Sequence, residues 1–139
     1  MLSATHAEEL RESWQLLGEE RQEAASQFLQ RLVADVPALQ ASLGGDPERS
    51  IRRIVTLMDY IVDHAEDGEA LLRTLRGLGH RYLDASVGRR EIHAAGLAWM
   101  WTLERRLGPE LTPPRLVAWS QVLAFILRAL RESAPAFAG

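Results

Sequence analysis

Tyr82 and His80 are the two side chains of this chain that first suggest a ligand site. A phenolate oxygen or an imidazole nitrogen can bind a transition metal. Leu71, Leu75, Leu78 and Tyr82 stand at i, i+4, i+7 and i+11, the spacing of one helix face, so Tyr82 is predicted to face the core. His80 lies roughly 200° away around the same helix and is predicted to be a surface histidine.

The phenol of Tyr82 binds a metal only after losing its proton, which requires a neighbouring cation or base. Arg81 is adjacent in the chain but points roughly 100° away on a helix. No other activator is evident. A core aromatic residue whose hydroxyl group is hydrogen-bonded therefore remains an alternative interpretation of Tyr82.

The rest of the chain shows no pattern typical of catalysis. The four histidines form no i, i+4 pair, and no Gly-rich phosphate loop is present. Ser50 and Ser86 have no predicted base, and Asp59 and Asp63 are expected to form a solvated helix face. We therefore expect a protein that is not an enzyme.

Composition narrows the class further. The 139 residues predict one domain, 1–139, with a frayed tail at 134–139. A net charge of −3 argues against a nucleic-acid partner. There is no Cys, which excludes disulfides and thioether-linked cofactors. The N-terminus does not resemble a signal peptide and no segment predicts a membrane span, so a cytoplasmic protein is expected.

Helical spacing of apolar residues recurs along the whole chain and predicts an all-α fold. Thr5, with Glu8 three residues later, is predicted to cap the first helix, which Gly18 ends. Asp46 and Pro47 are predicted to start a long helix that ends near Gly68. The remaining predicted helices run from about 19 to Pro37, through a short irregular helix 37–43, over 69–83, from about 89 to 107, and from Pro113 to about 130.

The segment around Tyr82 resembles the haem-binding helix of bacterial single-domain globins and neuroglobins. In those proteins Leu-Gly-x-x-His binds the iron and a Val follows five residues later. Leu78, Gly79 and Val87 keep their places here, whereas Tyr82 replaces the His. Further ordered matches cover about the whole chain: Arg11–Trp14, Phe28–Leu32 with Pro37, Ala95–Glu104 with Leu107 and Gly108, and Thr112–Pro113 with Ala118–Trp119.

The resemblance implies a globin fold of six to eight helices around a tetrapyrrole-type pocket. Leu29 stands where haem globins have Tyr or Phe, Leu43 where a Phe stacks on the macrocycle, and Ser50 where the distal His or Gln lies. Ile54 follows one turn later, and Arg53 falls where a basic residue meets a propionate, although a solvated charge is an equal alternative. The candidate binding residues are Leu29, Leu43, Ser50, Arg53, Ile54, Leu78, His80, Arg81, Tyr82, Val87 and Ile92.

Three functions follow from this pattern. The departures at Tyr82, Leu43 and Ser50 favour a pocket for a linear, biliverdin-like bilin, held non-covalently, as in the bilin-biosynthesis-associated globins that the chain resembles. The second is a haem globin with Tyr82 or His80 as axial ligand, for binding O2 or NO or for carrying haem. The third is a regulatory globin that holds no ligand or a fatty acid.

A homodimer through the last two helices is also predicted. The expectation rests on four aromatic residues, Trp99, Trp101, Phe125 and Phe137. Aromatic side chains are enriched at the centres of protein interfaces.

Overall fold

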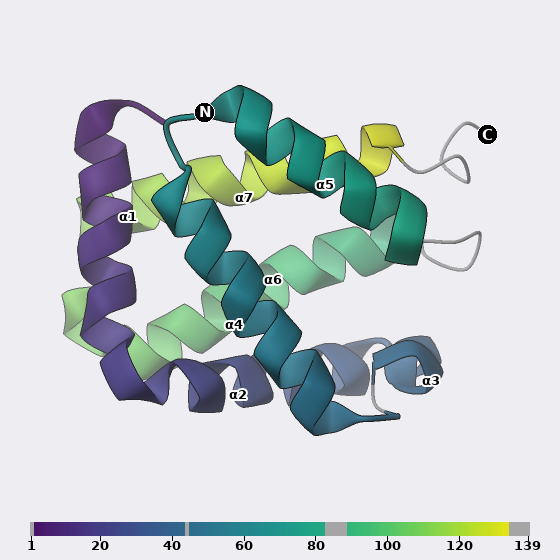
Figure 1. Ribbon diagram of the computed structural model, residues 1–139. Coiled ribbons are helices and arrows are strands. Elements are labelled where there is room, and N and C mark those ends of the chain that lie inside the picture. The colour runs from purple at the N-terminus through teal and green to yellow at the C-terminus, as the bar shows by residue number, and fades with distance from the viewer. Residues whose placement is uncertain (1, 44, 83–88, 134–139) are drawn as a thin grey trace.

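The computed structural model describes residues 2–43, 45–82 and 89–133 (Figure 1). Within these residues the chain is helical and contains no strand, which confirms the all-α prediction. The α-helices are α1 (Ala4–Leu17), α2 (Arg21–Asp35), α3 (Gln40–Leu43), α4 (Pro47–Asp63), α5 (Gly68–Tyr82), α6 (Arg89–Leu107) and α7 (Pro113–Ser133). Three 3-10 segments, Gly18–Glu20, Pro37–Leu39 and Gly108–Glu110, join them.

Residues with strong local preferences mark several helix boundaries. Gly18 and Gly108 adopt φ values of 49° and 51°, which side chains with a Cβ rarely tolerate, and each follows directly on a helix. The side chain of Asp46 accepts a hydrogen bond from the Arg49 amide at 3.2 Å, and Pro47 is the first residue of α4. The predicted start of this helix is confirmed.

Two predicted boundaries are wrong. Ser3, not Thr5, caps α1, because the Ser3 hydroxyl accepts a hydrogen bond from the His6 amide at 3.2 Å. The amide of Leu2 also donates to the Ala65 carbonyl at 2.9 Å, which holds the chain before Ser3 against the α4–α5 corner. α4 ends at Asp63 rather than near Gly68, and a turn precedes α5.

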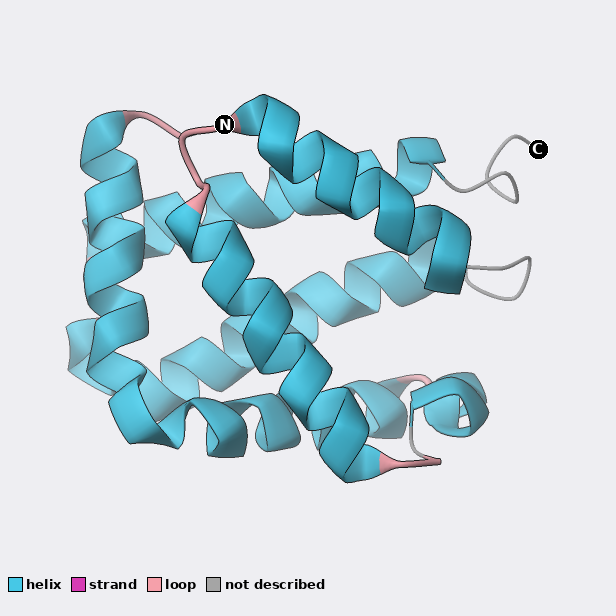
Figure 2. Ribbon diagram, viewed as in Figure 1, coloured by secondary structure: helices cyan, strands magenta, loops and turns pink. Residues whose placement is uncertain are grey.

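The helices pack in pairs that are distant in the sequence. α5 lies along α7, α2 packs on α6 and α4, and α1 packs on α7 and α4. Figure 1 shows α4 running diagonally in front of α6, with α5 above it and α2 below it. Between the described residues the connections are short, as the pink segments of Figure 2 show.

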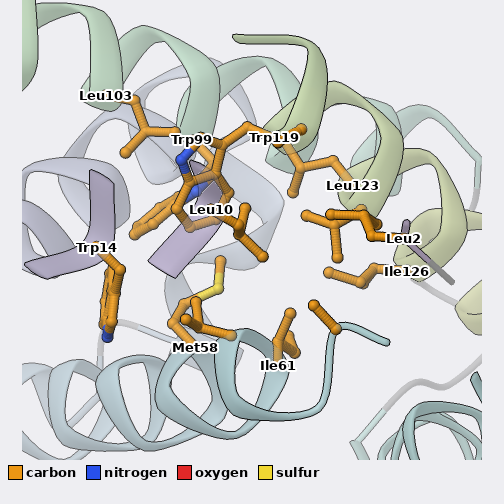
Figure 3. Close-up of a cluster of buried hydrophobic side chains, with 14 of the residues drawn as sticks. Leu2, Leu10, Trp14, Met58, Ile61, Trp99, Leu103, Trp119, Leu123 and Ile126 are labelled. Atoms are coloured by element: carbon orange, nitrogen blue, oxygen red, sulfur yellow. The ribbon is translucent and has the colours of Figure 1, made fainter. Parts of the chain in front are cut away.

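Three tryptophans form the centre of the main core (Figure 3). The ring centroids of Trp14, Trp99 and Trp119 are separated by 5.9 to 6.3 Å. The Ser13 hydroxyl accepts a hydrogen bond from Trp119 Nε1 at 2.7 Å and donates one to the Leu10 carbonyl at 2.8 Å. Because Trp99 is only 1% exposed, the prediction that it lies at a dimer surface is wrong.

Arginine side chains join the helices around this core. Arg21 lies with its guanidinium carbon 4.9 Å from the Trp14 ring centroid and donates to the Trp14 carbonyl. Asp59 accepts a hydrogen bond from Trp14 Nε1 at 2.7 Å, although 48% of its side chain remains exposed, and Asp63 is exposed, so the expected solvated face is present and Asp59 also binds α1 to α4. Arg115 forms ion pairs with Glu9, Glu12 and Glu110. Arg106 forms ion pairs with Glu20 and Glu23 and donates a hydrogen bond to Gln27.

Over the described ranges, no helix is long and apolar enough to cross a membrane.

Candidate functional site

The inward apolar stripe of α4 is covered unequally along its length. Side chains in the second half of the helix are buried in the main core, whereas those in the first half are only half-buried. The buried members are Met58, Ile61 and Val62, and the half-buried ones are Ile51, Ile54 and Val55. Large apolar side chains therefore remain accessible near the start of α4.

On α5 the burial of the apolar side chains decreases along the helix, whereas on α4 it increases. Leu71 and Leu75, towards its start, are 0% and 1% exposed, whereas Leu78, one turn later, is half-buried. Ile54 and Leu78 both pack against the main core. Figure 1 shows that α4 begins and α5 ends on the same side of the molecule, the side where α3 lies. We call these two helix segments, 47–55 of α4 and 78–82 of α5, the open end.

Leu29 on α2 and Ile92 on α6 are buried in the interior of the protein. Each is 5% exposed. Ile92, from α6, belongs to a second small apolar cluster with Leu32, Leu39 and Ala98, and α2 packs directly on α6. These two predicted site residues can therefore contribute at most a small edge to a ligand surface.

Two polar candidates lie on α4 at the open end. Ser50 is half-buried and, four residues before Ile54, shares its face of the helix. Arg53 is exposed and lies roughly 100° around the helix from Ile54. Its side chain therefore leaves α4 beside the face that carries Ile54.

The other candidates fall outside the described residues in whole or in part. The backbone of Leu43 is described in α3, and that of His80, Arg81 and Tyr82 in α5, but their side chains are not. Val87 is not described at all. The prediction that Tyr82 takes the place of the iron-binding His of globins therefore stays a prediction.

A concave surface, which the sequence analysis did not predict, lies at the corner between α4 and α5. It is an open cleft of about 750 Å³. Its signal in the sequence is the run of acidic residues between 63 and 69 that flanks His64. The cleft is lined by Arg11, Asp63, His64, Glu66, Asp67, Gly68, Glu69, Leu72 and Phe125.

Most polar groups of this cleft already serve the fold. Arg11 pairs with Glu66 at 3.1 Å, and Asp67 accepts a hydrogen bond from the Ala70 amide at 3.1 Å. The His64 ring stacks on Tyr60 with centroids 4.0 Å apart, and its Nδ1 lies 2.9 Å from the Tyr60 carbonyl oxygen. Across the described segments, no group of three His, Asp or Glu side chains could hold a metal ion.

Together these features define an all-α protein with a covered tryptophan core and an open, apolar end. A comparison of the chain with models of known protein families gives no match.

Proposed function

We propose that this chain is a globin-like protein that binds a linear, biliverdin-like tetrapyrrole non-covalently at the open end. The observation that carries the proposal is that Ile54 on α4 and Leu78 on α5 are only half-buried. Other large apolar side chains on the same face of each helix, such as Ile61 and Leu75, are buried. A ligand site for a largely apolar molecule requires apolar side chains that remain accessible, and Ile54 and Leu78 meet this requirement.

The helix arrangement supports this class. Globins pack their helices in pairs around a pocket that holds the tetrapyrrole. Here α2 packs on α4 and α6, and α5 packs on α7, so the four helices that carry Leu29, Ile54, Leu78 and Ile92 are connected through direct contacts or a shared core.

The chemistry of the described residues fits a tetrapyrrole. Ile54 and Leu78 can contact the faces of the pyrrole rings, and Arg53, beside the face that carries Ile54, can pair with a propionate. The chain has no Cys, so a bilin would be held without a thioether bond. Tyr82, His80 and Arg81 would provide polar contacts at the end of α5.

Haem and an acyl chain are the alternatives that the same apolar surface would accept. With haem, Tyr82 or His80 would be the axial ligand, and the iron would supply binding of O2 or NO. A fatty acid, or no ligand at all, would indicate a regulatory globin.

Parallel absorption titrations of the purified protein with biliverdin and with hemin test the proposal. We expect a structured, red-shifted bilin spectrum that saturates at one equivalent, with only loose hemin binding. Leu78→Arg should weaken bilin binding at least 10-fold, because a charge at this position would have to be desolvated under the ligand. Leu116→Arg, at a surface position on α7 that is 39% exposed, is the matched control and should bind normally.

Other outcomes would contradict the bilin assignment. A sharpened Soret band at one equivalent of hemin, with weak biliverdin binding, would assign the chain to the haem globins. If neither compound saturates the protein, the tetrapyrrole proposal is wrong.

A further inference from the structure

The outer face of α6 carries a stripe of accessible side chains. Taking 100° per residue, Arg90, His93, Trp101 and Glu104 lie within roughly 40° of Leu97 around the helix. Arg90, His93, Leu97 and Glu104 are exposed and Trp101 is half-buried. We call these five residues the outer stripe.

Leu97 is the most conspicuous member of this stripe. It is 59% exposed, more than any other large apolar side chain of the described residues. Gly96, next to it, faces inward and lies so close to α7 that a Cβ there would come within 2.9 Å of Leu127. Gly96 and Trp99 are both buried on the inner side of α6, which leaves Leu97 on the outside.

Trp101 is held in place beside Leu97 by two cations. The guanidinium carbon of Arg31 lies 4.6 Å from the Trp101 ring centroid, and that of Arg105 lies 5.1 Å from it. Cations at these distances are attracted to the ring, so part of its side-chain freedom is already lost before binding. Trp is among the residue types that contribute most to the binding energy of protein interfaces.

The charges of the outer stripe are arranged symmetrically about Leu97. Arg90 stands seven residues before it and Glu104 seven residues after it, with His93 and Trp101 four residues away on either side. If two copies of α6 cross antiparallel at Leu97, each Arg90 meets Glu104 of the second copy. Each His93 then meets Trp101 of the second copy, and the two Leu97 side chains meet on the axis.

We propose that the outer stripe docks on the same stripe of a second copy of this chain, in an antiparallel, two-fold symmetric dimer. A two-fold interface requires such self-complementarity, because the same patch serves both partners. One helix face is smaller than a standard interface, so the dimer is expected to form in the micromolar range or above. This proposal is independent of the tetrapyrrole site.

Sedimentation equilibrium over a range of protein concentrations tests the dimer. Leu97→Arg should abolish self-association, whereas Leu116→Arg, on α7, should leave it unchanged. Arg90→Glu and Glu104→Arg should each weaken it at least 10-fold, because each places like charges opposite one another. The double variant Arg90→Glu/Glu104→Arg should restore it, since the pairs are exchanged. Circular dichroism confirms that each variant is folded.

Several results would overturn the proposal. If wild-type protein stays monomeric at several hundred micromolar, the proposed dimer does not form. Self-association that persists in Leu97→Arg would place the interface elsewhere. Failure of the double charge exchange to restore a dimer that each single reversal weakens would exclude the antiparallel register.

Discussion

The open end and the opposite half of the molecule, near the α4–α5 corner, are built from the same two helices, α4 and α5. They differ in how deeply the apolar side chains of these helices are buried. We call the second half the closed part. Near the α4–α5 corner, the stripes of both helices are buried against α1 and α7, with the three tryptophans at the centre. At the start of α4 and the end of α5, the same stripes are half-buried. The closed part is therefore expected to carry most of the stability, and the open end to carry the ligand.

A matched pair of substitutions on α5 gives the largest expected difference between these regions. Leu75→Ala should lower the free energy of unfolding by about 2 to 5 kcal/mol, because it leaves a cavity in a buried core. Leu78→Ala should lower it by about 1 kcal/mol, because the side chain is already half in water. Urea unfolding followed by circular dichroism measures both. Equal losses would mean that the open end is as well packed as the core.

Ligand binding should add stability that depends on the open end rather than on the closed part. At a concentration of about 100 times its dissociation constant, biliverdin should stabilise the folded protein by about 2.7 kcal/mol. Leu75→Ala should keep this increment, since Leu75 lies in the closed part, whereas Leu78→Ala should reduce it. Unfolding curves with and without ligand measure the increment. The same increment in both variants would move the ligand away from the open end.

The buried hydroxyl group of Ser13 tests the closed part alone. Ser13→Ala removes the acceptor of Trp119 Nε1 and should cost about 1 to 3 kcal/mol, because a buried N–H group loses its partner. Ser120→Ala, at an exposed position on α7, is the matched control and should change stability by less than about 0.5 kcal/mol. Chemical denaturation measures both. Ligand affinity at the open end should be unaffected by either substitution.

The smallest effect concerns the cap at the start of α4. Asp46→Ala removes the acceptor of the Arg49 amide and should cost about 1 kcal/mol. Asp46→Ser keeps a capping oxygen and should cost less. Hydrogen exchange of the first amides of α4 locates the effect at the open end. Loss of protection spread over α5 and α7 instead would show that this end is not a separate region.

Local chemistry explains which parts of the fold could be predicted from the sequence. Gly18, Pro37 and the Asp46–Pro47 pair restrict the backbone by themselves, and the predicted boundaries at these residues agree with the structure. Ser3 and Thr5 are both good capping residues, so spacing alone could not decide between them. The contact of Leu2 with Ala65, 63 residues along the chain, favours Ser3.

The candidate site was less predictable because the spacing of apolar residues tells which helix face a side chain lies on but not how deeply it is buried. The spacing of Ile54 and Leu78 correctly places both on inward stripes, yet it cannot tell that they are half-buried while Ile61 and Leu75 are buried. That difference depends on which neighbouring helices pack on each turn of α4 and α5, and this is a tertiary property that periodicity does not contain. In the same way, spacing could not separate buried Trp99 from half-buried Trp101, two residues later.

The grouping of the tryptophans has an optical consequence. Three of the four indole rings lie within 6.3 Å of a neighbour in the group, close enough for their electronic transitions to couple. Near-ultraviolet circular dichroism of this protein should therefore contain an exciton signal that belongs to the closed part alone. Trp101 on α6, which contacts the guanidinium groups of Arg31 on α2 and Arg105 on α6, is not part of this group and can act as a separate fluorescent reporter of the outer stripe.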